Sequence, residues 1–154
     1  MKVPESPMVA EIFDRQAIFV EGPLHPGHLE NWFLELRRRE DCGASVLFSG
    51  QVRADRLSGK EVSGISYSAY PELASPLMEE FLTEAAFSAE LKLIGVKQSV
   101  GFIKPGEISL FLMMAGAHRK ALLDAQARMV EFLKYRFPVW KKECYTDGSH
   151  IWQK

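Results

Sequence analysis

The segment from Phe132 to Glu143, FLKYRFPVWKKE, limits the possible fold more than any other part of the chain. Lys134 lies near the end of a helical pattern of apolar residues, and Pro138 follows it closely. Proline lacks a backbone N–H, its ring clashes with the preceding helical turn, and it favours an extended conformation at the residue before it. The segment therefore predicts a helix that ends before Pro138 and a strand that begins at Val139.

This corner places Lys134 and Lys141 on different elements. On a single helix, their separation of seven residues would put them about two turns apart on the same face. Because they lie on either side of a corner, the two ammonium groups can instead converge on one small anion. The alternative is that both are solvated surface lysines, and other parts of the sequence have to decide between these two interpretations.

The composition is that of a globular chain. It has 154 residues, of which 47% are hydrophobic and 25% charged, so we expect one domain over residues 1–154 with a core that needs no metal or disulfide. No apolar run has the length of a signal peptide or a membrane helix, and we expect a cytoplasmic protein that does not contact membranes. Cys42 and Cys144 stand far apart without metal-ligand spacing, so the sequence indicates no metal site, no disulfide and no cofactor.

The apolar pattern predicts an α+β fold in which a mostly antiparallel sheet carries three helices packed on it. The predicted helices span residues 26–40, 71–91 and 118–136, and the second becomes regular only at Pro76. The predicted strands span residues 9–20 (a pair or one broken strand), 43–52, 60–70, 96–103, 107–116 and 139–145.

Some of these elements also have expected neighbours. The strand at 107–116 is apolar on both faces, which is typical of a central strand. Only a short loop separates the strands at 43–52 and 60–70, so we expect these two to pair antiparallel. The residues expected to face the core are Leu29, Trp32, Phe33 and Leu36 in the first helix, Leu77, Met78, Phe81, Leu82 and Ala85 in the second, Leu122, Ala125, Met129, Phe132 and Leu133 in the third, and Trp140 in the last strand.

Positive charge is concentrated near the C-terminal end of the sequence. The net charge is −1, yet residues 118–142 contain seven Lys/Arg and two acidic residues, a local excess of +5. A basic segment on an otherwise acidic chain suits a small anion or an acidic partner segment better than duplex nucleic acid.

Two further motifs carry candidate anion-binding residues. Arg53 ends the strand motif GQVR, where a guanidinium can reach towards an anion, although a strand-end arginine is also an ordinary solvated charge. His118 and Arg119 stand at the start of the third predicted helix, where cations oppose the helix dipole unless an anion binds the exposed N–H groups. Tyr70, in the motif YSAYPEL, suits a core or capping position as well as a substrate contact.

Taken together, four motifs resemble the large, catalytic subunit of molybdopterin synthase, the MoaE family. They are GASVLFSGQVR, YSAYPEL, AGAHRK and LKYRFPVWKKE, in this order and at these intervals, and the resemblance runs from about residue 8 to Trp152. It implies the α/β hammerhead fold of that family and an enzyme that converts cyclic pyranopterin monophosphate to molybdopterin by adding two sulfurs as a dithiolene.

The resemblance also implies partners and residue roles. The sulfur would arrive as a thiocarboxylate on the C-terminal Gly-Gly tail of a small ubiquitin-like (MoaD-like) sulfur-carrier subunit, and the chain would form a homodimer within a heterotetramer. By motif position, Lys134 and Lys141 resemble the catalytic lysines of the family, and Arg53, His118 and Arg119 resemble its residues for the pterin phosphate. We assign Lys134 to the end of the tail and Lys141 to the pterin, although the sequence does not separate these two roles.

Chemistry agrees with this interpretation, because thiocarboxylate and phosphate are both anions. A lysine whose pKa is lowered by neighbouring cations can also move protons as sulfur adds and oxygen leaves. Strand alternation puts Lys142 and Cys144 on the face opposite Lys141 and Glu143, so we expect no sulfur transfer through Cys144.

Two alternatives from other classes remain open. A non-catalytic adaptor for an acidic or ubiquitin-like tail needs the basic segment but not both lysines. An RNA-binding module needs exposed aromatic residues among the positive charges, and Tyr135 and Trp140 are the best placed.

Overall fold

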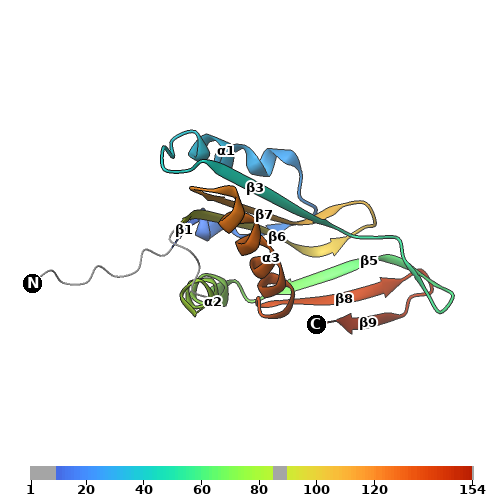
Figure 1. Ribbon diagram of the computed structural model, residues 1–154. Coiled ribbons are helices and arrows are strands. Elements are labelled where there is room, and N and C mark those ends of the chain that lie inside the picture. Colours follow the sequence, from blue (N-terminus) through green and yellow to red (C-terminus); the bar gives the residue numbers. More distant parts are fainter. Residues whose placement is uncertain (1–9, 85–89, 154) are drawn as a thin grey trace, which may run out of the picture.

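A computed structural model describes residues 10–84 and 90–153 of the chain (Figure 1). One large, mostly antiparallel sheet forms its centre, with the strand order β3-β7-β6-β5-β8-β9. These strands are β3 (Ala44–Gln51), β7 (Ile108–Gly116), β6 (Leu91–Ile103), β5 (Lys60–Ala69), β8 (Val139–Tyr145) and β9 (His150–Gln153). Short strands β1 (Glu11–Phe13) and β2 (Phe19–Glu21) run parallel to β6, and β4 (Arg56–Leu57) pairs with β5.

Strand β6 joins the two halves of the sheet. Along one edge it pairs with β7, to which it is connected by a tight turn at Pro105 and Gly106, and Gly106 adopts the positive φ of 87° that such a turn favours. Its other edge pairs with β1 and β2 and then, at residues Gly101 to Ile103, with β5. The sheet therefore has two halves, β3-β7 and β5-β8-β9, which diverge near the C-terminal end of β6.

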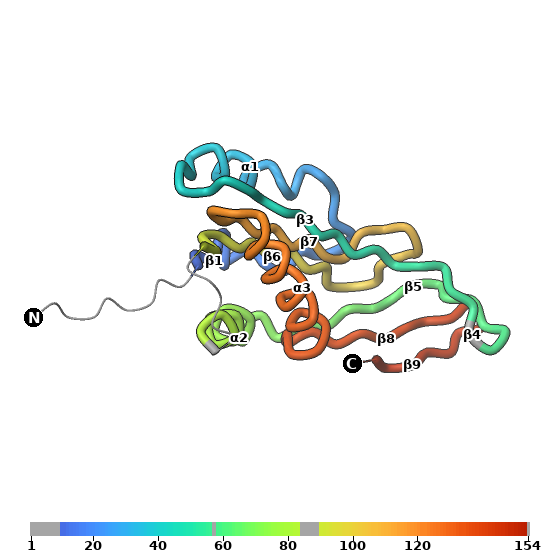
Figure 2. Tube along the Cα trace, viewed as in Figure 1, coloured from blue at the N-terminus to red at the C-terminus, as the bar shows by residue number. Residues whose placement is uncertain are grey.

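The helices cover both faces of the sheet (Figure 2). Helices α2 (Pro71–Glu84) and α3 (Arg119–Tyr135) pack on one face, where Leu112 and Met114 of β7 belong to the same buried cluster as Met78 and Met129. The opposite face of β7 contributes Phe111 and Met113 to a second cluster with Trp32 of α1 (Glu30–Leu36). The prediction of a central strand with two apolar faces is confirmed, and so is the predicted α+β fold, with three α-helices in the part of the chain that the structure describes.

Several predicted elements have the bounds expected from the sequence. The last strand, β8, is the predicted 139–145, and α3 lies within the predicted 118–136. All five residues predicted to face inward from α3 are buried: Leu122, Ala125, Met129, Phe132 and Leu133. The first predicted strand is broken, since the 3₁₀ turn Arg15–Ala17 separates β1 from β2.

The predicted pairing of the second and third strands is wrong. β3 pairs with β7, whereas β5 pairs with β6 and β8. The segment between them contains a short strand, β4, which forms the hairpin with β5 in place of β3. Pairing with β3 makes β7 an inner strand, as its two apolar faces require.

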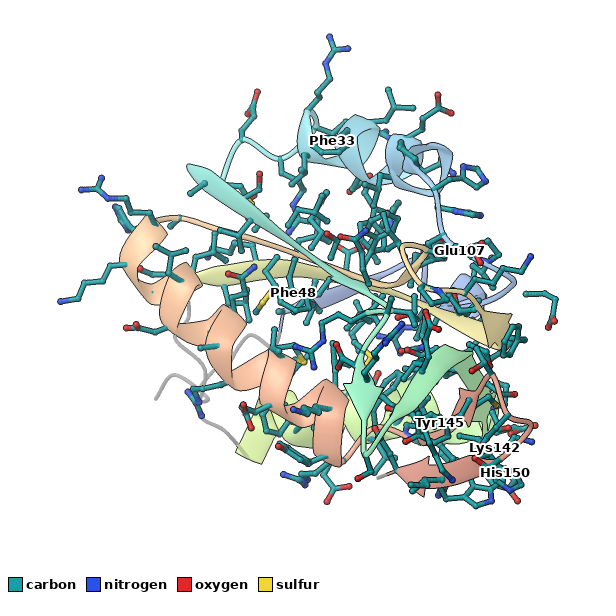
Figure 3. All side chains as sticks on the ribbon, turned by 90° about the vertical axis from the view of Figure 1, so that its right-hand side faces the viewer. Phe33, Phe48, Glu107, Lys142, Tyr145 and His150 are labelled. Carbon is teal, nitrogen blue, oxygen red and sulfur yellow. The ribbon has the colours of Figure 1, made fainter. Side chains whose placement is uncertain are left out.

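The first two helices also differ from prediction. The first begins as a 3₁₀ turn, Pro26–Leu29, and α1 ends at Leu36, so the helix stops before the expected residue 40. Leu29 and Trp32 are buried as predicted, but Phe33 is 50% exposed on α1 (Figure 3).

The second helix is regular from Pro71, and Pro76 lies inside it. Its predicted end at residue 91 is wrong, because Leu91 begins β6, while Ala85 lies outside the described residues. Met78 and Leu82 are buried, with Leu77 and Phe81 packed beside them.

Candidate functional site

A cavity of about 300 Å³ lies between the second half of α3 and the point where the two halves of the sheet diverge. Helix α3 forms one wall through Val130, Leu133 and Lys134, while the sheet contributes residues from β3, β5, β6, β7, β8 and β9. Phe48 of β3 lines this cavity on the helix-facing side of the sheet (Figure 3). The volume lies at the lower end of the range for small-molecule sites.

The corner after α3 is held by aromatic packing. Phe137 is buried and meets the ring of Phe132 edge to face, with centroids 6.0 Å apart. The carbonyl oxygen of Pro138 accepts a hydrogen bond of 3.0 Å from the backbone N–H of Tyr70, and β8 begins at the next residue. The chain thus turns directly from helix to strand, as Pro138 predicts.

The turn brings Lys134 and Lys141 to the same cavity. Lys134 is exposed at the end of α3, and its ammonium lies 5.3 Å from the centroid of the Tyr135 ring. Lys141 is half-buried on β8. Burial lowers the pKa of Lys141, and the positive charge of Lys134 lowers it further. The corner therefore brings the two lysines to one cavity, and their binding of a common anion stays a prediction.

Arg53 lies at the mouth of the cavity. β3 ends at Gln51 after a register shift between Gly50 and Gln51, and the chain then carries Arg53 into the loop. The guanidinium forms an ion pair of 3.1 Å with Asp55 and its side chain is 82% exposed, so it can turn towards a ligand at little cost.

Glu143 is a site residue that the sequence interpretation left out. Its carboxylate lines the cavity beside Lys141, and it accepts hydrogen bonds from the Tyr145 hydroxyl (2.7 Å) and from Nε2 of Gln153 (2.8 Å). Two donors from two strands hold this carboxylate in one position. Strand alternation from Lys141 was the signal that could have included it.

The other face of β8 carries Lys142 and Cys144, as the alternation predicts. The ammonium of Lys142 lies 5.6 Å from the centroid of the Trp152 ring, and Sγ of Cys144 lies 3.5 Å from the carbonyl oxygen of Lys142. Neither residue lines the cavity, and neither does Cys42.

His118 and Arg119 lie at the opposite end of α3 from Lys134. His118 is the N-cap residue, and its Nδ1 lies 2.9 Å from a carboxylate oxygen of Glu90. The 16 residues from His118 to Lys134 span about 24 Å along a helix. Within one chain, therefore, these two residues do not reach the cavity.

The aromatic residues near the corner are more exposed than predicted. Trp140, expected in the core, is 39% exposed because its side chain points away from the cavity-facing side of β8. Tyr70 is 59% exposed and meets Trp140 edge to face at 5.3 Å. Its carbonyl oxygen accepts the hydrogen bond from Leu73 N–H at the start of α2, so its backbone serves the capping position.

The described residues also limit other kinds of site. Among residues 10–84 and 90–153, no three His, Cys, Asp or Glu side chains gather closely enough to hold a metal ion. None of the helices in these ranges combines the length and apolar character that crossing a membrane requires.

Two lysines and an arginine outnumber the two carboxylates, Asp55 and Glu143, that line the cavity, and this excess of positive charge suits a small anionic ligand. The model of the family described as MoaE protein matches residues 21–136 of this chain. The molybdopterin synthase catalytic subunit of Dictyostelium discoideum is 31% identical over 134 residues, which cover 86% of this chain and 84% of that protein. Molybdopterin synthase catalytic subunit 1 of Aedes aegypti is 36% identical over 116 residues, covering 75% and 74%.

Solved structures share the fold. The molybdopterin synthase of Staphylococcus aureus superimposes with a TM-score of 0.70 at 23% identity, covering 90% of this chain and 97% of that one. A complex of subunits 1 and 2 of the molybdopterin-converting factor from Helicobacter pylori gives a TM-score of 0.69 at 23% identity, covering 88% of each chain.

The chain belongs to the MoaE family, since the family model covers most of its length and relatives above 30% identity match most of it as well. Because these relatives are named catalytic subunits, the comparisons do not favour the non-catalytic adaptor considered from the sequence.

Proposed function

We propose that this chain is the catalytic subunit of a molybdopterin synthase and that it converts cyclic pyranopterin monophosphate to molybdopterin by sulfur transfer. The cavity shared by Lys134 and Lys141 is the observation that carries this proposal. The substrate phosphate and the thiocarboxylate that delivers sulfur are both anions. Three cationic residues (Arg53, Lys134 and Lys141) and two carboxylates (Asp55 and Glu143) line the cavity, so positive charge is in excess there.

The two lysines differ in environment, and this difference suggests different roles. Lys134 is exposed at the mouth, where the C-terminal tail of a sulfur-carrier subunit would arrive. Lys141 is half-buried, and its lowered pKa increases the fraction of neutral amine near pH 7. A neutral amine can accept a proton and return it as sulfur adds and oxygen leaves. We therefore assign Lys134 to the tail and Lys141 to proton transfer at the pterin.

The sulfur donor in this proposal is a small ubiquitin-like subunit with a C-terminal Gly-Gly thiocarboxylate. The Helicobacter pylori structure is a complex of two subunits, and a corresponding pair for this chain is consistent with an open, cationic cavity mouth. Neither cysteine lines the cavity, which supports a sulfur source outside this chain.

His118 and Arg119 fit this function only if a second copy of the chain supplies them. Among the described residues, β3 is the outer strand of the sheet. Its eight residues, Ala44–Gln51, include no charge and no proline, and its register shift lies only at the last step, between Gly50 and Gln51. Natural proteins usually protect such an edge with charges, proline or bulges, so a long uncharged edge favours pairing with another strand. We propose that two copies pair their β3 edges antiparallel in a homodimer.

This pairing would bring the distant residues together. Ala44 lies opposite Gly116, two residues before His118, whereas the other end of β3, Gln51, lines the cavity. Antiparallel pairing about a two-fold axis places the start of one β3 beside the end of the other. Eight residues of strand span roughly 24 Å from first to last, which matches the length of α3 between His118 and Lys134. The second copy would then place His118 and Arg119 near the cavity of the first.

The experiment that tests the function is turnover by single lysine variants. Lys134→Ala and Lys141→Ala should each abolish molybdopterin formation from the pyranopterin and a thiocarboxylated partner, while calorimetry shows partner binding close to that of the wild type. Lys142→Ala is the matched control, because Lys142 is a neighbour on β8 that does not line the cavity. Lys134 is exposed, and substitutions of exposed side chains usually change stability by about 0.5 kcal/mol or less. Full turnover by either cavity variant would overturn the proposed function.

A further inference from the structure

Three buried side chains of the cavity are polar and neutral, and the paired lysines do not explain them. Tyr67 of β5, Gln98 of β6 and Ser109 of β7 all line it, with exposed fractions of 7%, 7% and 5%. We call these three residues the polar floor. They contrast with the mouth, where Arg53 and Lys134 are exposed.

The hydrogen bonds that the polar floor makes within the described residues leave some of its donors and acceptors without a partner. The Tyr67 hydroxyl donates to Oγ of Ser109 at 3.1 Å, and Ser109 in turn lies 3.5 Å from the carbonyl oxygen of Gly50, a long contact. Nε2 of Gln98 donates to the carbonyl oxygen of Ser99 at 3.0 Å. Among the described residues, this is the only bond of the Gln98 amide, which leaves one N–H donor and the Oε1 acceptor for a ligand.

Three strands place these groups beside apolar side chains of the cavity, with Lys141 opposite Tyr67 as a charged neighbour. Phe48, Leu110 and Val130 line the same cavity, and a polar group buried among such residues costs free energy unless it is hydrogen-bonded. Burial also raises the pKa of Tyr67, which keeps its hydroxyl neutral. The floor therefore offers neutral donors and acceptors and no charge.

We propose that the polar floor binds the hydrogen-bonding edge of the pterin ring, with Gln98 as the principal specificity-determining residue. This inference rests on the proposed function, since it assumes that the substrate is a pterin. The amino-pyrimidinone edge of a pterin presents adjacent N–H donors and a carbonyl acceptor, and a primary amide with one free donor and one free acceptor is complementary to it. A neutral floor below a cationic mouth orients the substrate with its heterocycle inward and its phosphate outward.

The test separates heterocycle binding from anion binding. Free 6-hydroxymethylpterin, followed by its own fluorescence, probes the floor, and inorganic phosphate, followed by calorimetry, probes the mouth. Gln98→Met removes the amide with little change in size. We expect it to weaken pterin binding about tenfold or more, as the loss of one or two buried hydrogen bonds implies, and to leave phosphate binding unchanged.

Controls distinguish recognition from a structural role. Gln16→Met makes the same exchange at an exposed residue outside the cavity and should change neither affinity. Ser109→Ala is a second floor variant, to be used if Gln98→Met does not fold, and it should weaken pterin binding selectively as well. Equal loss of both probes, unchanged pterin affinity in a folded floor variant, or no pterin binding by the wild type would overturn the inference. Selective loss in a protein whose wild type makes no molybdopterin would support the floor and contradict the proposed function instead.

Discussion

Lys134→Ala, which should lack turnover, and Arg119→Ala, which should bind the pterin phosphate weakly, should restore activity to each other if His118 and Arg119 serve the cavity of a second copy. Lys134→Ala lacks a lysine in its own cavity, and Arg119→Ala lacks the residue that it would contribute to its partner. In a heterodimer of these two chains, one cavity carries both defects and the other carries neither. Each heterodimer therefore contains one intact site and should show about half the molybdopterin formation of the wild-type dimer, as two-fold symmetry requires.

The measurement uses co-expression with two different tags, purification of the heterodimer through both, and turnover with a thiocarboxylated partner. Lys134→Ala combined with Lys141→Ala is the matched control. Both lysines line the same cavity of one chain, so every site in that heterodimer keeps one defect and no rescue is expected. Within one chain, about 24 Å of α3 separates His118 from Lys134, so Arg119 does not reach the cavity of its own chain. An inactive Lys134→Ala and Arg119→Ala heterodimer, or rescue in the control, would refute the shared site.

Two more predictions concern the lysine pair and the thiols. Because the pKa of Lys141 is lower in the folded chain than its usual value of 10.5, the unfolded chain binds more protons between these two values, and the unfolding free energy should rise with pH across that interval. Lys141→Met should remove this rise in chemical denaturation, whereas an unchanged pH profile would contradict the burial of the amine. The double variant Cys42→Ser with Cys144→Ser should still make molybdopterin at nearly the wild-type rate with thiocarboxylated partner, and loss of turnover in the folded variant would show that sulfur passes through these thiols.

The parts of the fold that local rules determine were predictable from the sequence. Pro138 ends one element and starts another, so the bounds of α3 and β8 followed from one residue and its apolar neighbours. The inward face of α3 followed from helical spacing, because Leu122, Met129 and the other apolar residues repeat with its period.

The parts that depend on distant pairing were not predictable in the same way. β3 and β5 both have sheet-like sequences, and nothing local shows that β3 pairs with β7, which lies more than fifty residues further along the chain. Strand β9 was missed because its four residues, His150–Gln153, are all exposed and show no alternation. The distance between His118 and Lys134 follows from helix length, but the motif pattern alone does not show that these residues lie at opposite ends of one helix and so cannot share a cavity within one chain.

The candidate site combines both kinds of determinant. Pro138 explains why Lys141 lies on a strand beside the end of α3, but the burial of Lys141 comes from the antiparallel register in which it stands opposite Tyr67 of β5. Directly opposed residues in such a pair project to the same face of the sheet, and both of these line the cavity. This cross-strand pair therefore places the ammonium-bearing Lys141 directly beside Tyr67 of the polar floor. A one-residue slip of β8 against β5 would turn Lys141 and Glu143 away from the cavity and bring Lys142 and Cys144 into it, so the register of this pair determines which side chains the site contains.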